Sequence, residues 1–590
     1  MKARLIAIYL LIGFFLSAVS RTDALYVAYL AVGLLAAFTA KENEENAPSL
    51  MGFKRVILYG LPALFSLGVL LSEYDGLRQI LLPQDYFAAR KATFVLTLCL
   101  LAAGGFIIGR EILLFFFRHT GGGERSSQGK EADDQNEEGL SFKACALAFG
   151  ILWGIDLLYL FLCAYPGNLT TDSLSQISQI VSGVYSDHHP YWHTRLIRVF
   201  FRLGTALAGD VNGGAACFHV FQSAVLCLSF VYVLKTLYDI GIRGWRWRLV
   251  FLSYLLLPYH ILYSVTLWKD VLFAALFTIF TTAAYRYFER PVKTEGKTAW
   301  QDLLFLLLGG AGVCLLRSNG WLVFFLTTVI FLLLYRKKAW PLVPVLLCTL
   351  LMNTALLRAL PVEKADSLEA LALPMQQITR TVTTEDTLST EEQDLVETLV
   401  PIEELRSAYD PALADPVKAF IRQRGTLPVL EENKSAYFRL WLSLGLRHPG
   451  AYLQAFTDLT KGYWNAGYDN YLWAQGIGAN ELGLAVTEKS HIATALKNSY
   501  LWLFENLAFL KLIKCIGLYF WTAVFLSGAL ILRNRREAAL ILPYLFLFLT
   551  LFLATPVNNE FRYIYALPCV LPLFLGMMEE EGSENALPQK

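Results

Sequence analysis

The stretch YPGNLTTDSLSQISQIVSGVYSDHHPYWHT, residues 165–194, directly follows a hydrophobic span and combines an aspartate with three histidines. Ser173 and Gln176 fit a capping box, which predicts a helix that begins at the serine and leaves Asp172 just ahead of it. Gln176 and Gln179 are expected to turn away from an apolar face formed by Leu174, Ile177, Ile180, Val181 and Val184. A second amphipathic run follows, so we expect a pair of short helices on a membrane surface.

The composition outside this stretch is that of a membrane protein. Of the 590 residues, 55% are hydrophobic and 17% are charged, against about 25% charged in soluble domains. Hydrophobic stretches near the ~20 residues that cross a bilayer recur along the chain. Hydropathy predicts an all-α protein with about fourteen transmembrane helices. They start near Arg4, Leu25, Val56, Ala92, Ala144, Ala215, Leu249, Val271, Leu303, Trp321, Trp340, Leu512, Ala538 and Tyr563.

Lysine and arginine in the connectors predict which loops face the cytoplasm, because cytoplasmic loops are enriched in both. With strict alternation of the spans, the basic connectors fall on one side: 235–248, 285–297, 335–338 and 533–536. The other face then carries residues 165–213, 268–270, 317–320, 361–511 and 555–562. The opening stretch is therefore expected outside the cytoplasm, where neither ATP nor nucleotide-sugars are available.

This topology predicts six segments. They are four leading helices (1–118), a flexible cytoplasmic loop (119–142), a transmembrane core (143–360) with an outer loop at 165–213, an extracytoplasmic helical domain (361–511), three final helices (512–577) and a cytoplasmic tail (578–590). The expected location is a bacterial cell membrane with both termini in the cytoplasm. The expected partners include the lipid bilayer and no nucleic acid.

Isolated polar residues stand at the outer ends of several spans. Lys269 and Asp270 lie in YSVTLWKD, Arg317 and Asn319 lie in LLRSNGW, and Glu560 and Arg562 lie in TPVNNEFRY. Each cation alone is typical of an interfacial anchor that reaches the headgroups. Several cations on the face that is usually depleted of them, each beside a carboxylate or amide, favour binding of a lipid phosphate or pyrophosphate.

Asp172 and the histidines leave alternatives open. Asp172 fits a helix N-terminal carboxylate that only stabilises the dipole, or a general base. His189 and His193 are four residues apart and would share one edge of a helix, as metal ligands do. The zincin pattern needs a glutamate after the first histidine, where this chain has Pro190. We therefore predict no metal and no cofactor, and a polar role for both histidines.

The outer segment 361–511 is rich in Glu, Leu and Ala at helical spacing. Within LPMQQITRTV, Gln376, Gln377 and Arg380 could reach back to the membrane site, or lie on the solvated face of a helical cap. An aromatic cluster could stack on sugar rings or sit in headgroups: Tyr463, Trp464, Tyr468, Tyr471 and Trp473.

The order YPG, DS, Q, HHP, HT, LWKD, RSNG, a large outer segment and EFRY resembles a family of uncharacterised multi-pass proteins from Gram-positive bacteria. Those proteins are in turn similar to the GT-C superfamily of integral membrane glycosyltransferases. The resemblance covers about residues 143–577. It implies a GT-C-like fold and a sugar donor linked to a polyprenyl phosphate. In GT-C enzymes an acidic residue in the first outer loop is the general base, and Asp172 matches that position; no second acidic residue adjoins it, which favours a metal-independent reaction.

The expected function is inverting transfer of a sugar to an extracytoplasmic envelope glycan, lipid or protein acceptor. Asp172 would be the base, and Lys269, Arg317 and Arg562 would bind the donor phosphate. Substrate would be positioned by His188, His189, His193, Asn319, Glu560, Gln376 and Arg380. One alternative is a transporter or flippase for a lipid-linked precursor, although such proteins show paired halves and midplane charges. Another is a non-catalytic partner in assembly of an envelope polymer.

Overall fold

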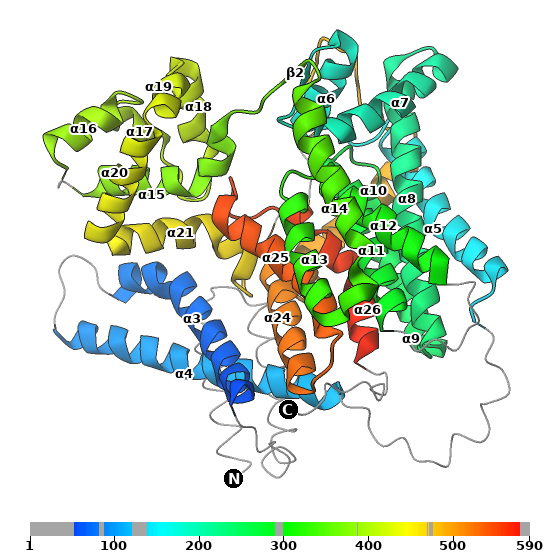
Figure 1. Ribbon diagram of the computed structural model, residues 1–590, viewed down its shortest axis with the longest axis horizontal. Coiled ribbons are helices and arrows are strands. Elements are labelled where there is room, and N and C mark those ends of the chain that lie inside the picture. Colours follow the sequence, from blue (N-terminus) through cyan, green and yellow to red (C-terminus); the bar gives the residue numbers. More distant parts are fainter. Residues whose placement is uncertain are drawn as a thin grey trace.

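The computed structural model describes residues 52–81, 88–120, 139–289, 299–385, 388–468, 470, 472 and 476–578, and these are almost entirely helical (Figure 1). The spans expected near Arg4 and Leu25 lie outside the described residues. So do Tyr471 and Trp473, most of the loop predicted at 119–142, and the tail after residue 578.

Among the described residues, six helices are long and apolar enough to cross a membrane. These spans are Phe53–Tyr74 in α3 (Phe53–Leu81), Thr97–His119 in α4 (Ala88–His119), α5 (Phe142–Cys163), α8 (Val211–Asp239), α11 (Lys269–Phe288) and Gly320–Ala339, which contains α13 (Gly320–Tyr335) and η1 (Arg336–Ala339). Shorter apolar helices are α12 (Ala299–Leu316), α14 (Leu342–Leu351) with η2 (Met352–Leu356), α24 (Ile516–Leu532), α25 (Ala538–Ala554) and α26 (Ala566–Met577). These helices indicate a membrane protein.

The stretch near Leu249, where one span was predicted, contains two shorter helices, α9 (Gly244–Leu256) and α10 (Pro258–Ser264). Leu257 between them has an extended backbone, with ψ of 125°. Proline has no N–H to donate within a helix and pushes the preceding residue out of the helical region. Pro258 therefore ends α9 and starts α10. Helix α10 ends at Ser264, shortly before α11 (Lys269–Phe288) begins.

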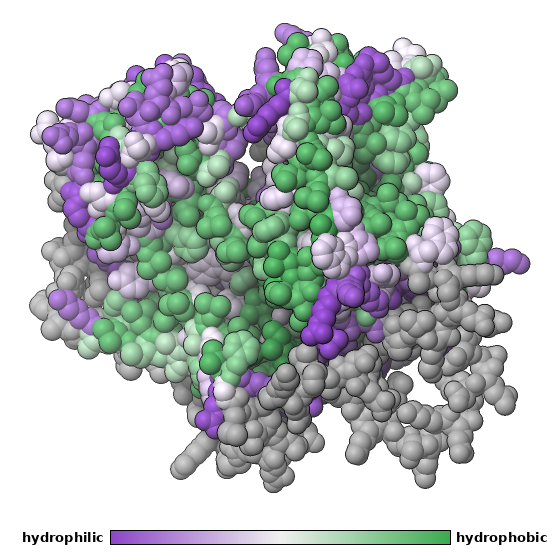
Figure 2. Space-filling view, in the orientation of Figure 1, coloured by the Kyte–Doolittle hydropathy of each residue, from purple (hydrophilic) through white to green (hydrophobic). Residues whose placement is uncertain are grey.

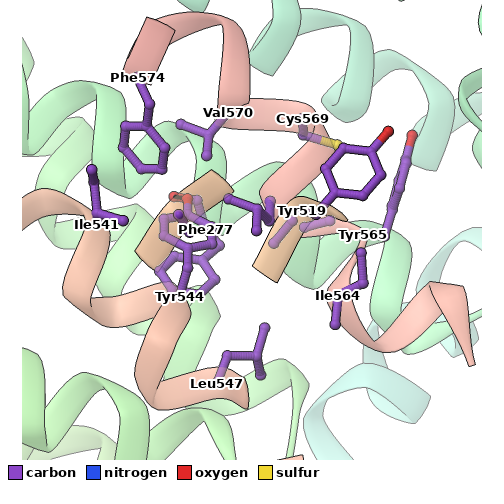
Figure 3. Packing of buried hydrophobic residues seen from close by; sticks show 14 of the residues in the cluster. Phe277, Tyr519, Ile541, Tyr544, Leu547, Ile564, Tyr565, Cys569, Val570 and Phe574 are labelled. Atoms are coloured by element: carbon purple, nitrogen blue, oxygen red, sulfur yellow. Dashed lines mark hydrogen bonds between the residues drawn. The ribbon is translucent and has the colours of Figure 1, made fainter. Parts of the chain in front are cut away.

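Helix α11 lies at the centre of the bundle, and 83% of the residues in its apolar 18-residue stretch are buried inside the protein. It packs against α8, α12 and α26. Gly309 allows α12 to approach closely, because a Cβ there would lie 2.7 Å from the Phe280 backbone nitrogen. On the α25 side the rings of Phe277 and Tyr544 stack with centroids 4.3 Å apart, within the cluster drawn in Figure 3. This rigid centre holds the first residues of α11, Lys269 and Asp270, at one end of the bundle.

A second set of elements completes the described fold. It begins with α6 (Thr171–Ser182), β1 (Tyr185–Ser186) and α7 (Tyr191–Ala208). It continues with β2 (Val362–Glu363), η3 (Ser367–Leu371), α15 (Ala372–Thr384), α16 (Thr390–Glu397), α17 (Ile402–Ala408), α18 (Asp415–Arg424), α19 (Leu427–Glu432), α20 (Lys434–Arg447), α21 (Pro449–Trp464), α22 (His491–Asn506), α23 (Ala508–Lys511) and η4 (Leu512–Lys514). Helices α15–α20 form a separate lobe in Figure 1, with a hydrophobic core of their own. We call residues 367–464 the outer domain.

Two backbone connections join the outer domain, and the strand β2 that leads into it, to the loops at the end of the bundle. Strand β1 pairs in parallel with β2, Tyr185 opposite Val362. The turn before α18 pairs with the chain after α25, because Asn558 donates its N–H to the Ala412 carbonyl and Ala414 donates to that of Pro556. Hydrophobic residues cover the visible face of the bundle, whereas hydrophilic residues gather over the outer elements (Figure 2).

Candidate functional site

Asp172 lies in the first turn of α6, not ahead of it as the sequence suggested. The helix begins two residues before the predicted serine, because the capping box is formed by Thr170 and Ser173. The Ser173 N–H donates to Thr170 Oγ1 at 3.5 Å, and the Thr170 N–H donates to Ser173 Oγ at 2.9 Å. This reciprocal cap sets the start of α6 and holds the Asp172 side chain at its exposed edge.

The buried face of α6 also differs from the prediction. Gln176 is 1% exposed and donates to His193 Nδ1 at 3.0 Å and to Thr194 Oγ1 at 2.8 Å. Val181 and Val184, predicted on the apolar face of this helix, are exposed. At a membrane surface apolar side chains can face lipid, so hydrophobicity alone does not say which face packs on the protein. Gln176 instead joins α6 to α7.

Arg562 brings together residues from distant parts of the chain. Its Nη1 donates to Asp172 Oδ2 at 2.8 Å, across 390 residues of sequence. Its Nε lies 3.6 Å from Glu560 Oε1. The guanidinium carbon also lies 4.6 Å from the centre of the Trp268 ring. Arg562 belongs to η5 (Phe561–Ile564), directly after the segment that pairs with the outer domain.

The other two predicted cations lie beside this group. Arg317 Nη1 lies 3.0 Å from Asp270 Oδ1 and donates to the Tyr563 carbonyl at 2.8 Å. Lys269 Nζ donates to His189 Nδ1 at 3.4 Å and, among the described residues, takes part in no ion pair. Arg317 is therefore held by a carboxylate and a carbonyl, whereas the Lys269 ammonium is available to another anion.

The charges around Asp172 set its protonation. Burial raises the pKa of this carboxyl, but the charge of Arg562 and the other nearby cations outweigh it, so its pKa lies below its usual value. Burial is the larger effect for Glu560 and raises its pKa despite Arg562. Burial together with Lys269 lowers the pKa of His189 to about 3. The His189 ring is therefore neutral, and because Nδ1 accepts from Lys269, Nε2 carries its proton.

The three histidines do not act as one group. Helix α7 begins at Tyr191 with Pro190 as its N-cap, so His189 precedes the helix and does not share an edge with His193. His188 is exposed and lies edge-on to His189, with ring centres 4.8 Å apart. His193 is fully buried, where its ring contacts the Gln176 side chain and lies edge-on to Phe218. In the part of the chain that the structure describes, no group of three or more His, Cys, Asp or Glu side chains is arranged to hold a metal ion.

The remaining predicted residues make their contacts elsewhere. Asn319 Nδ2 donates to Thr550 Oγ1 on α25 at 2.7 Å. Gln376 is buried and donates to the carbonyls of Asp410 and Leu413, in the turn that pairs with residues 556–558. Arg380 Nη1 bonds Asp458 Oδ2 at 2.9 Å within the outer domain. The polar atoms of Gln376 and Arg380 thus hold the outer domain together and do not reach the cluster.

The structure adds to the site three residues to which the sequence assigned no role. Trp268 underlies Arg562 and donates its indole N–H to Thr170 Oγ1 at 3.1 Å, which ties the α6 cap to the start of α11. Asp270 pairs with Arg317, and the Tyr563 ring lies 4.8 Å from the Arg317 guanidinium. Trp268 and Asp270 stand beside Lys269 in LWKD, and Tyr563 follows Arg562 in EFRY. Their position next to charged residues at the ends of spans is the sequence feature from which they could have been predicted.

We define the outer cluster as Asp172, His189, Trp268, Lys269, Asp270, Arg317, Glu560 and Arg562. It offers an ionised carboxylate, a neutral imidazole with a free N–H, and cations of which Lys269 is uncommitted. A third of the Asp172 side chain is exposed, so the cluster is open to a ligand. The arrangement can bind an anion and accept a proton beside it.

Comparison with known proteins places this chain in a family. No curated protein and no solved structure matches it. Residues 181–589, well over half of the chain, match a family described as of unknown function, DUF6020. The matched range includes His189, Lys269, Arg317 and Arg562 of the outer cluster and begins after Asp172. The chain therefore belongs to the DUF6020 family.

Proposed function

We propose that the protein is a membrane glycosyltransferase that moves a sugar from a polyprenyl-phosphate-linked donor to an acceptor outside the cytoplasm. The proposal includes a GT-C-like fold, about fourteen spans and a bacterial cell membrane with both termini inside. The observation that carries it is the ion pair between Asp172 and Arg562, beside the unpaired Lys269. A carboxylate next to cations that can exchange partners suits a reaction in which a phosphate leaves while a hydroxyl loses its proton.

The donor phosphate would bind between Lys269 and Arg562. Arg562 then turns part of its guanidinium from Asp172 to the phosphate, and Asp172 becomes a stronger base. Asp172 Oδ2 accepts the proton of the acceptor hydroxyl as that oxygen attacks the anomeric carbon. The bond from this carbon to the phosphate oxygen breaks, and the electron pair leaves with the phosphate, whose charge the cations stabilise. The His189 Nε2–H is placed to donate a hydrogen bond to donor or acceptor.

This exchange predicts a pH signature. An opposite charge lowers a carboxyl pKa by about 1–3 units, so loss of part of the Arg562 contact should raise the pKa of Asp172 by up to that amount. The acid limb of kcat/KM reports the free enzyme and that of kcat reports the donor complex. We expect the kcat limb at the higher pH. Coincident limbs, measured in vesicles across the acid range, would contradict the exchange.

The proposed activity is tested in the cell that makes the protein. Deletion of the gene should remove one sugar component from an envelope glycan, glycolipid or glycoprotein and cause the polyprenyl-phosphate sugar to accumulate. Mass spectrometry of extracted lipids and hydrolysed envelope measures both. A deletion strain with unchanged envelope sugars and no donor accumulation would rule out the activity.

One observation favours transport as a second candidate function. Asp156 is buried inside the membrane span α5, where Cys227 Sγ donates to its Oδ2 at 3.3 Å. Ionisable residues within membrane spans commonly mark ion or substrate pathways. Translocation of a fluorescent polyprenyl-phosphate sugar that fails in Asp156→Asn, with transfer chemistry retained, would favour this candidate over the transferase.

A further inference from the structure

An apolar pocket opens into the outer domain. Helices α15–α20 line it, and its volume is about 560 Å³. Protein interiors are close-packed and hold few voids larger than a water molecule, whereas ligand pockets measure about 300–1,000 Å³. A pocket of this size in a small helical domain is therefore more consistent with a binding site than with a packed core.

The walls of this cavity specify an apolar ligand. They are formed almost entirely by hydrophobic side chains, among them Val400, Val417 and Ile421, which are otherwise buried in the domain core. A cavity that holds water needs several polar partners for it, and these walls supply few. A hydrocarbon chain would replace the missing packing contacts without leaving polar groups unpaired.

The mouth of the cavity specifies an anionic group at the end of that chain. Lys434 and Phe438 line the cavity, are exposed, and lie one turn apart on α20. Among the residues that the structure describes, Lys434 takes part in no ion pair. An unpaired ammonium beside an apolar opening complements a phosphate or carboxylate attached to a hydrocarbon chain.

The position of the outer domain, next to the apolar helices of the bundle, indicates that such a ligand would come from the membrane. The last helix of the domain, α21, packs against α3, α24 and α25 of the bundle. The domain therefore rests on apolar helices of the bundle, of which α3 is long enough to cross a membrane, and lies within reach of lipid. Free apolar molecules are scarce in water, whereas hydrocarbon chains make up the core of the adjacent bilayer.

We propose that the outer domain binds the hydrocarbon chain of an anionic membrane lipid, with the chain in the α15–α20 cavity and the headgroup at Lys434. This site is separate from the outer cluster, and the proposal does not depend on sugar transfer. An acyl chain and an isoprenoid chain share the required chemistry, so the probes below distinguish them.

The test is photo-crosslinking of the full-length protein in vesicles. One preparation contains phosphatidylglycerol with a diazirine on an acyl chain, and the other contains diazirine-bearing farnesyl phosphate. Peptide mass spectrometry after irradiation should place adducts on residues 396–405 and 434–441 with the preferred probe. Ile378→Trp adds bulk to the cavity wall and should lower that yield about tenfold, whereas Leu446→Trp, on the exposed side of α20, should not.

A second variant keeps the test decisive if Ile378→Trp fails to fold. Lys434→Glu reverses the charge at the mouth and leaves the core unchanged, so it should lower capture of the anionic probe more than capture of a diazirine diacylglycerol. Adducts confined to the membrane spans, or equal yields in Ile378→Trp and Leu446→Trp, would overturn the site. Equal loss of the anionic and neutral probes in Lys434→Glu would overturn the headgroup assignment.

Discussion

Replacing Asp172 by Asn should lower the rate of sugar transfer by about 10²–10⁴-fold, the contribution of a positioned general base. Asn keeps the size of the side chain and an oxygen that can accept the 2.8 Å bond from Arg562, so the fold of the outer loop should survive. The amide cannot take the proton of an acceptor hydroxyl. Transfer is measured with purified protein in vesicles, using a radiolabelled polyprenyl-phosphate sugar and envelope acceptor from the deletion strain.

The matched control is a carboxylate with only a capping role on the same face of the bundle. Asp210 caps α8 by accepting the Gly213 N–H at 2.6 Å, so Asp210→Asn should retain transfer. Full activity in Asp172→Asn would rule out Asp172 as the base and leave it as a helix N-terminal carboxylate. If Glu560→Gln abolishes transfer while Asp172→Asn does not, Glu560 is the base, in keeping with its raised pKa.

Arg562→Gln should reduce kcat by about 10²–10³-fold, as removal of one group that stabilises developing charge typically does, and should also raise KM for the donor. Glutamine removes the charge that faces Asp172, Glu560 and the donor phosphate. Arg562→Lys should recover part of the loss, because a lysine ammonium supplies charge without the planar, two-pronged donor set. The same vesicle assay, run over a range of donor concentrations, separates kcat from KM.

An arginine in an ion pair outside the cluster provides the comparison. Arg424 pairs with Glu404 on the surface of the outer domain, and Arg424→Gln should leave both kinetic constants near wild type. Equal losses in Arg562→Gln and Arg424→Gln would show a general structural effect. Unchanged donor KM in Arg562→Gln, with an intact fold, would contradict phosphate binding by Arg562.

The gathering of charged residues at one end of the bundle could be predicted because it follows from local chemistry. Charged residues at the ends of apolar spans stay where water is accessible, so Lys269, Arg317 and Arg562 could be assigned to one face from the sequence. Their mutual contacts could not be predicted. The bond between Arg562 and Asp172 depends on how α26 packs against α11 and α8, and no periodicity encodes a contact across 390 residues.

Predictions of local structure were wrong where the sequence allowed two chemically similar arrangements. Thr170 and Ser173 can each start α6, and the indole of Trp268, which donates to Thr170, favours the earlier start. Gln176 was assigned to the polar face because glutamine is hydrophilic, yet His193 and Thr194 satisfy it in the interior. The apolar pocket of the outer domain could not be predicted from the sequence, because the residues that line it have the pattern of an ordinary apolar helical core.

The two backbone connections, residues 185–186 with 362–363 and 412–414 with 556–558, couple the position of the outer domain to that of the outer cluster. The first connection involves the loop that precedes His189, and the second involves the segment that precedes Arg562. A movement of the outer domain would therefore displace the His189 imidazole and the Arg562 guanidinium together, and with them the donor site that we propose. Lipid binding in the outer domain and donor binding at the outer cluster would then be thermodynamically linked, each changing the affinity for the other by the same factor.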